Sequence, residues 1–169
     1  MTTLETIFLI LLLVLMIGFI WIITEISDLK RQEKVAPSAN PETLKLRLQA
    51  YERVSLLAER ISLQNILSRT PNDGLSYRQM QRALIDAIKE EYEYNISQQV
   101  YVSNDMWNAV TKLKEQNIYI INQVAANIST QASGIDLNKR IIEYVMNNPK
   151  SQLQNLVLEA LNFEAKELM

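Results

Sequence analysis

Five polar side chains could meet in one place if two segments of this sequence form neighbouring helices. Glu91, Asn95 and Gln98 follow one another at spacings of four and three residues, and Lys114 and Asn117 lie three residues apart further along the chain. Residues three or four apart share one face of a helix, so each set would form a row. This candidate polar cluster could bind a polar ligand or join the two helices through an ion pair.

The first row continues the apolar face of its own helix. Ser76 and Gln79 form a capping-box pattern that predicts a helix start. At 100° per residue, Glu91 lies about 20° from Leu84, in the middle of the apolar stripe. Isolated carboxylates are costly to bury, so Glu91 must be paired, protonated or hydrated. The stripe consists of Tyr77, Met80, Leu84, Ala87, Ile88 and Tyr92.

Three interpretations of Glu91 stay open. The helix could simply outrun the core, so that its last turns meet solvent or lipid headgroups. Glu91 could instead form a structural pair with Lys114, which interrupts the apolar row of the next helix together with Asn117. A ligand-binding or catalytic role is the least favoured, because Glu90 and Glu93 face away and no second inward acid accompanies Glu91.

The composition narrows the classes of function. The chain of 169 residues contains no cysteine, no histidine and only three glycines. It therefore lacks the commonest general base, every thiolate metal ligand and a glycine-rich phosphate loop. With 17 Lys and Arg against 19 Asp and Glu, the net charge is -2, which disfavours a nucleic-acid partner. We expect no catalytic residue, no cofactor and no metal ion, and thus no enzyme.

A membrane anchor is predicted near the N-terminus. Residues 7–23, IFLILLLVLMIGFIWII, are uninterrupted apolar positions that would span about 25 Å as a helix. The five residues before Thr6 include no Lys or Arg, which argues against a cleaved signal peptide. The anchor thus runs from Ile7 to Ile23, with Trp21 as an interfacial residue, while Gly18 has no small partner four residues away.

Basic residues predict the orientation of this anchor. Lys30, Arg31 and Lys34 follow the span, whereas no basic residue precedes it. Since positive residues stay on the cytoplasmic side, we expect a single-pass protein of the inner (cytoplasmic) membrane, with its N-terminus outside and its C-terminal domain in the cytoplasm. The predicted organisation is an anchor with its juxtamembrane segment at 1–30, a linker at 31–40 and a helical domain at 41–169.

About five helices are expected in the C-terminal domain. They are predicted from Pro41 to about Ser68, from Ser76 through the row that ends at Gln98, from Ser103 to about residue 128, from Asp136 to Asn147, and from Asn148 onward. Residues 100–102, VYV, are predicted as a short extended connector. No segment alternates for long enough to predict a sheet, so the fold class is all-α, an N-terminal transmembrane helix followed by a helical bundle.

The anchor, the segment LQAYERVSLLAERIS and the segment QRALIDAIKEEYEYNISQQVYVSNDMW together resemble an uncharacterised family of small, membrane-anchored proteins of Bacteroidota. The resemblance covers nearly the whole chain and implies an architecture, with NISQQVYVS as its recurring feature. It implies no catalytic residue, because the family carries a domain-of-unknown-function label.

Three hypotheses of function follow. The first is a membrane-anchored binding or scaffold module without catalytic activity, whose partners are the lipid bilayer and either another protein or a second copy of the chain. The second is a small-ligand receptor or enzyme with a polar pocket between the second and third predicted helices, closed by the candidate polar cluster with Tyr94 or Tyr101. The third is self-assembly through the first or the last helix.

Overall fold

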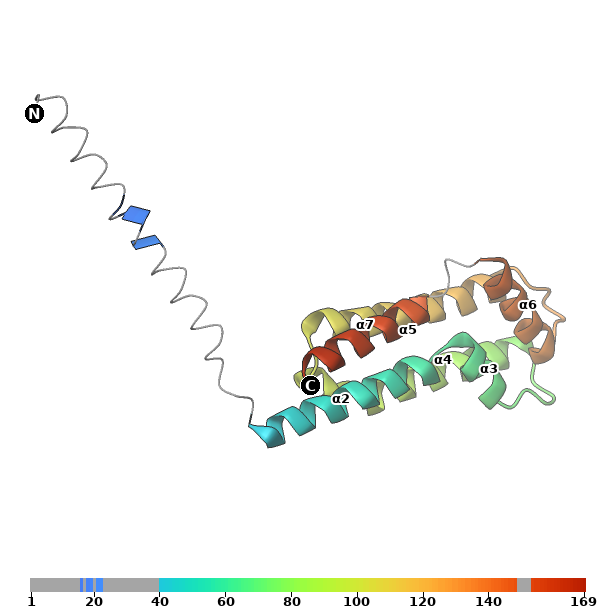
Figure 1. Cartoon of the computed structure of the whole chain (residues 1–169). Helices are drawn as coiled ribbons and strands as arrows, with labels where there is room; N and C mark the ends of the chain where they lie inside the picture. Colours follow the sequence, from blue (N-terminus) through green and yellow to red (C-terminus); the bar gives the residue numbers. More distant parts are fainter. Residues whose placement is uncertain (1–15, 17, 20, 23–39, 149–152) are drawn as a thin grey trace, which may run out of the picture. The chain divides into compact units, whose positions relative to one another are not determined.

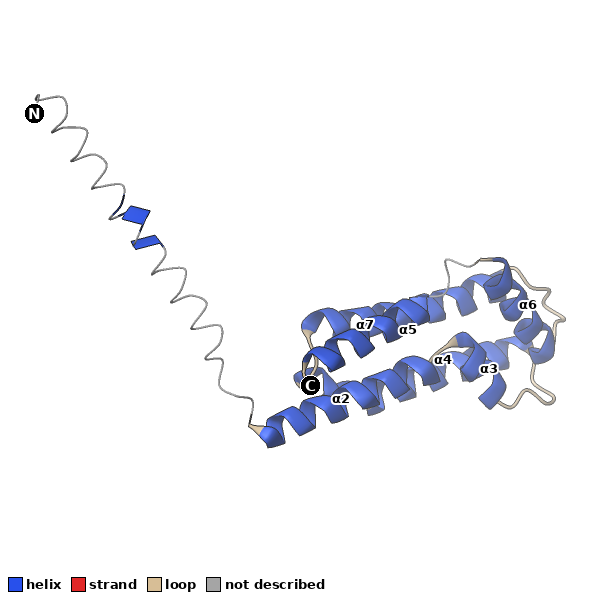
Figure 2. Ribbon diagram, viewed as in Figure 1, coloured by secondary structure: helices blue, strands red, loops and turns tan. Residues whose placement is uncertain are grey.

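The computed structural model describes residues 16, 18, 19, 21, 22, 40–148 and 153–169. The chain divides into two compact units, Met1–Glu42 and Thr43–Met169. Within the described residues the protein is all-α, with helices joined by short turns and no strand (Figure 2). The predicted fold class is thus confirmed for the helical domain.

Before residue 40, the N-terminal unit is described at five positions. These positions, which include Gly18 and Trp21, are helical and exposed. Ile7 and Ile23, like most of the predicted span and residues 31–39 of the predicted linker at 31–40, lie outside the described residues. Among the residues that the structure does describe, no helix combines the length and the apolar character needed to cross a bilayer.

The second unit is a bundle (Figure 1). Its long helices run alongside one another, the short helices α3 and α6 lie at one end, and the last residue of the chain lies at the other. The helices are α2 (Pro41–Arg60), α3 (Leu63–Arg69), α4 (Tyr77–Tyr94), α5 (Asn104–Ala126), α6 (Gly134–Asn147) and α7 (Leu153–Glu167), with a 3₁₀ helix, η1 (Ile96–Val100), between α4 and α5.

The helix predicted from Pro41 to Ser68 is broken in two, so that prediction is wrong. α2 ends at Arg60, and Ser62 caps α3 by accepting a hydrogen bond from the Asn65 amide at 3.3 Å. The break frees the carbonyl of Ile61, which accepts a buried hydrogen bond of 2.8 Å from the side-chain amide of Asn117. No glycine or proline marks this point in the sequence. The break is stabilised instead by this tertiary contact.

The second difference concerns the segment after α4. Asn95 ends α4, and residues 96–100 form η1, followed by a turn at Tyr101. The α-helical row predicted from Glu91 to Gln98 therefore stops at Asn95, and the predicted extended connector at 100–102 is wrong. A 3₁₀ helix turns 120° per residue, so Gln98 leaves the face that Glu91 and Asn95 share.

Two helices begin from one junction. Ser76 starts α4 and Ser133 starts α6, each with a complete capping box, and the two serines form an antiparallel bridge. The amide of Gly134 donates to the Leu75 carbonyl at 2.7 Å. A Cβ at Gly134 would lie 3.1 Å from the Cβ of Met80, so the missing side chain allows this close approach. α6 therefore starts two residues before the predicted Asp136.

The core lies between these helices, and α7 contributes only part of its apolar side chains to it. Leu156 is exposed at 64%, while Val157 and Leu161 are the buried residues of α7. The largest fully buried side chains are Leu57, Ile61, Ile66, Met80, Leu84, Ile88, Leu113, Ile121, Leu137, Ile141, Leu161 and Val54.

Candidate functional site: the Glu91 groove

Glu91 is the meeting point of two arginines. Its Oε1 accepts hydrogen bonds from Nε and Nη2 of Arg60, at 2.8 and 2.5 Å, and from Nη1 of Arg69 at 3.3 Å. The Glu91 side chain is 18% exposed, whereas those of Arg60 and Arg69 are 53% and 38% exposed. The carboxylate is thus paired and mostly covered, and the two cations reach solvent.

The break between α2 and α3 makes this convergence possible. In one continuous helix, Arg60 and Arg69 would be nine residues apart and would point about 180° away from each other. Because the chain turns at Ile61 and Ser62, both arginines reach the same carboxylate. Arg69 Nη2 also donates to the carbonyl of Arg60 at 2.8 Å. Both arginines end their helices, where a cation is favoured by the helix dipole.

This pairing keeps Glu91 ionised. The hydrogen bonds from Arg60 lower the pKa of Glu91, burial opposes that effect, and Arg69 lowers the pKa further. The same contact raises the pKa of Arg60 above its usual value. A carboxylate held in its charged form is a poor proton donor. The arrangement therefore suits electrostatic recognition better than proton transfer.

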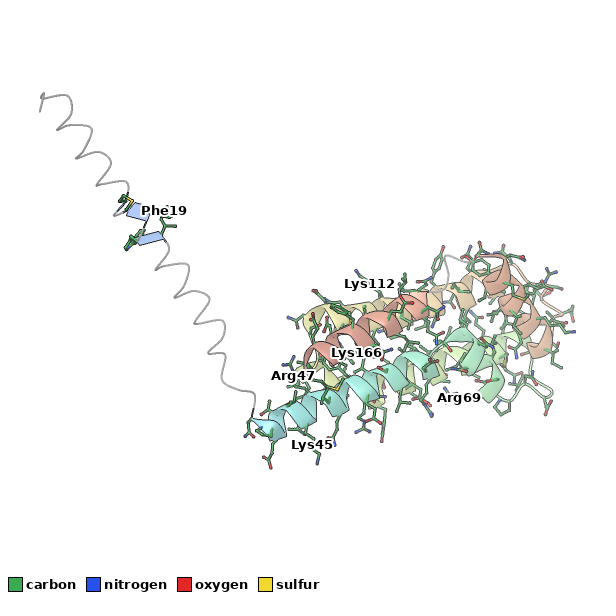
Figure 3. The ribbon with its side chains drawn as sticks, viewed as in Figure 1. Phe19, Lys45, Arg47, Arg69, Lys112 and Lys166 are labelled. Carbon is green, nitrogen blue, oxygen red and sulfur yellow. The ribbon has the colours of Figure 1, made fainter. Side chains whose placement is uncertain are left out.

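A surface groove surrounds these charges, with a cavity volume of about 620 Å³. Beside Glu91 it exposes apolar surface, because Leu56 is 55% exposed and Tyr94 is 74% exposed. The guanidinium of Arg53 lies 5.7 Å from the centroid of the Tyr94 ring, within the range of a cation–π contact. The Glu91 groove is lined by Arg53, Leu56, Leu57, Arg60, Ile66, Arg69, Thr70, Ala87, Glu90, Glu91, Tyr94 and Asn95. Figure 3 shows Arg69 on α3, at the end of the bundle away from Lys45 and Arg47.

The predicted partner of Glu91 is wrong. Glu91 pairs with Arg60 and Arg69, whereas the Lys114 ammonium lies 4.1 Å from the centroid of the Tyr92 ring. The Tyr92 ring in turn packs against the ring of Trp107, with centroids 5.1 Å apart. Lys114 does not line the Glu91 groove, which lies between α2, α3 and α4 instead of between α4 and α5.

The other members of the candidate cluster separate. Asn95 is buried and donates to the Glu91 carbonyl at 2.9 Å, which ends α4. Asn117 is 3% exposed, and its side-chain amide donates to the Ile61 carbonyl at the break between α2 and α3. Gln98 lies in η1 and donates to the Ser97 hydroxyl at 3.2 Å. Only Glu91 and Asn95 of the five belong to the groove, and the three arginines were not anticipated.

A second carboxylate joins α2 to the far end of the chain. Glu164 accepts hydrogen bonds from the hydroxyls of Tyr51 at 2.6 Å and of Ser103 at 3.0 Å. The amide of Ser103 donates to the Tyr51 hydroxyl at 3.2 Å. Burial raises the pKa of Tyr51, and the hydrogen bond to Glu164 raises it further. This Glu164 network holds α7 and the start of α5 against α2.

Within the described residues, no group of three His, Cys, Asp or Glu side chains is placed to hold a metal ion. The chemistry of the Glu91 groove comes from guanidinium donors, an ionised carboxylate and an exposed aromatic ring. Such a set can bind an anionic group beside an apolar one.

A comparison with protein families matches residues 1–168 to a family of unknown function, DUF7935, so the chain belongs to this family. The predicted membership of an uncharacterised family is thereby confirmed, while the bacterial group and the anchor remain predictions. Comparisons with curated proteins and with solved structures found no match.

Proposed function

We propose that this member of DUF7935 is a membrane-anchored helical binding module without catalytic activity, with its bundle in the cytoplasm. Support for the anchor comes from the seventeen apolar residues at 7–23 and from the basic residues Lys30, Arg31 and Lys34 after them. The absence of histidine and cysteine from the sequence supports a function in binding.

In this proposal, the Glu91 groove is the site where a protein partner binds. A protein partner would place an acidic side chain near Arg53 and Arg60 and an apolar side chain over Leu56 and Tyr94. The exposed side chain of Arg60 has donors left after the pairing with Glu91. No ion pair among the described residues involves Arg53, whose guanidinium lies over an aromatic face. Arginine and tyrosine are also the residue types enriched at the centres of protein interfaces.

Site-specific photo-crosslinking in native membranes tests this proposal. A photoreactive residue replaces Leu56 in the full chain, and a control places the same residue at Tyr119, which is exposed at 63% on α5. We expect a discrete crosslinked product from position 56 and none of the same mass from position 119.

Charge reversal then shows whether the groove recognises an acid. Arg53→Glu should abolish the product, because the partner's carboxylate would meet a like charge. The matched control Arg82→Glu changes an exposed arginine of α4 that does not line the groove and should leave the product unchanged. An unchanged product in Arg53→Glu would exclude an acidic partner in this groove, and a product of twice the chain's mass would identify a second copy.

A further inference from the structure

The corner between α4 and α5 exposes apolar side chains on a segment that itself contains no charged residue. We name residues Tyr94–Asn104, YNISQQVYVSN, the η1 corner; no Asp, Glu, Lys or Arg occurs in it. Four of its side chains are exposed apolar or aromatic groups, namely Tyr94 at 74%, Ile96 at 46%, Val100 at 75% and Tyr101 at 38%. Exposed clusters of this kind mark contact surfaces more often than isolated apolar residues do.

Part of the backbone of the η1 corner is hydrogen-bonded within the corner. The amide of Gln98 donates to the Asn95 carbonyl at 2.9 Å, and the amide of Tyr101 donates to the Gln98 carbonyl at 3.0 Å. The buried side chain of Asn95 closes the end of α4. Each peptide group that is already paired lowers the cost of moving this surface into a less polar medium, because fewer hydrogen bonds to water are lost.

The η1 corner lies at the end of the bundle where α2 begins. Ser103, at the C-terminal side of the corner, donates from its amide to the hydroxyl of Tyr51 on α2. Tyr51 is ten residues from Pro41, about 15 Å along the helix. Figure 1 shows the start of α2, the start of α5 and the last residue of the chain at this same end.

Chain length places a bilayer within reach of this end. Seventeen residues separate Ile23, the end of the predicted span, from Pro41. At most they can extend about 60 Å, so an anchored chain allows its η1 corner to reach the membrane. Because the corner and the bilayer would belong to one tethered system, even weak contact would be favoured by a high effective concentration.

We propose that the η1 corner is a lipid-contact surface that rests in the interfacial region of the membrane, an inference that depends on the proposed anchor. Two of its four exposed apolar side chains are tyrosines, which favour the level of the lipid headgroups. Since residues 94–104 include no charged side chain, we expect an apolar contact that does not require anionic lipid.

The absence of cysteine from the sequence allows a direct test with single spin labels. Val100→Cys and Met146→Cys are matched variants, because both side chains are apolar and 75% exposed while lying on η1 and α6 respectively. The full chain carrying each nitroxide is reconstituted into phosphatidylcholine vesicles and into vesicles of equal parts phosphatidylcholine and phosphatidylglycerol. Its accessibility to oxygen and to a polar nickel reagent is then measured.

We expect a several-fold higher ratio of oxygen to nickel accessibility at position 100 than at position 146, in both kinds of vesicle. Equal ratios at the two positions would overturn the proposal. So would a contact seen only with anionic lipid, or dipolar broadening at position 100 without a gain in oxygen accessibility, which would show that a second copy covers the corner.

Flotation of the vesicles after an alkaline carbonate wash separates this inference from the proposed anchor. Loss of the chain in the wash would refute the anchor, and the lipid contact with it. Retention of the chain with equal accessibility at positions 100 and 146 would refute the lipid contact alone and leave the anchor standing.

Discussion

Two carboxylates tie α2 to the rest of the bundle, and they do so with opposite chemistry. Glu91 receives charged guanidinium donors from Arg60 and Arg69. Glu164 receives neutral hydroxyl donors from Tyr51 and Ser103. The cations around Glu91 are partly exposed, whereas Tyr51 is 2% exposed. The Glu91 cluster is therefore open to exchange with outside charges, whereas the Glu164 network is a structural joint built on a buried tyrosine.

This difference suits the Glu91 groove to binding a partner and the Glu164 network to stabilising the fold. A ligand acid could share or take over the arginines of the Glu91 groove without uncovering the core, because their donors reach solvent. At Glu164 an incoming group would have to displace the hydroxyl of Tyr51, whose ring is part of the core. We therefore expect substitutions at the joint to affect mainly folding, and substitutions in the groove to affect mainly binding.

The largest effect should come from Tyr51. Tyr51→Ala removes a buried ring and should lower the free energy of unfolding by about 3–5 kcal/mol, whereas Tyr51→Phe keeps the ring and should cost about 1–2 kcal/mol. Urea denaturation of the full chain in detergent micelles, followed by circular dichroism, measures both. Tyr119→Ala, at an exposed position, is the control. If it lowers stability as much as Tyr51→Ala, the Glu164 network is not the joint described above.

Asn117 should give the next largest effect, because its hydrogen bond stabilises the break that brings the arginines together. Asn117→Ala leaves the Ile61 carbonyl without its buried donor and should cost about 1–3 kcal/mol. The exposed Asn108→Ala is the matched control on α5. A double-mutant cycle with Glu91→Ala sharpens the result. Coupling between the two substitutions is expected if the break orients Arg60 and Arg69, and strict additivity would argue against that link.

Glu91 itself should give a smaller loss. Glu91→Ala removes a partly exposed ion pair and leaves two arginines near each other, so a cost of about 1 kcal/mol is expected. The loss should shrink as salt is added, because the partners are solvent-accessible. The exposed Glu90→Ala serves as the control. An unchanged melting temperature in Glu91→Ala would make a stabilising ion pair untenable.

The pH dependence of the two regions should be opposite and the smallest of these effects. The pKa of Glu91 is lowered by Arg60, so its stabilisation is present above its usual pKa and is lost as the pH falls. The pKa of Tyr51 is raised by burial, so its stabilisation is present below its usual pKa and is lost as the pH rises. The free energy of unfolding of each variant is measured as a function of pH and compared with that of the parent chain. Glu91→Gln should reduce the fall in stability at acid pH, and Tyr51→Phe should reduce the fall at alkaline pH. A variant that reduces the fall in stability at the opposite end of the pH range contradicts this assignment.

Local chemistry made most of the fold predictable from the sequence. Ser76 and Ser103 were recognised as helix starts because each cap is complete within a few residues. The break after Arg60 was missed because Asn117, far away in the sequence, supplies the donor that Ile61 needs.

The partners of Glu91 were missed for the same reason. A continuous helix sends Arg60 and Arg69 to opposite faces, so the site exists only after the break is known. Glu91 could be recognised as unusual from its place on an apolar stripe, but its partners could not. The pattern of one helix does not reveal which neighbouring helix covers it.

The shared start of α4 and α6 has a consequence for the order of folding. Ser76 and Ser133 are far apart in sequence, with α4 and α5 between them, so their bridge closes a long loop and is costly to form early. The α4–α5 hairpin can form before the loop closes, and the junction then acts as a clasp that completes the bundle. Ser133→Ala removes the side-chain cap that starts α6 at this junction. It should accordingly speed unfolding and leave the refolding rate nearly unchanged, which stopped-flow measurements of both rates can check.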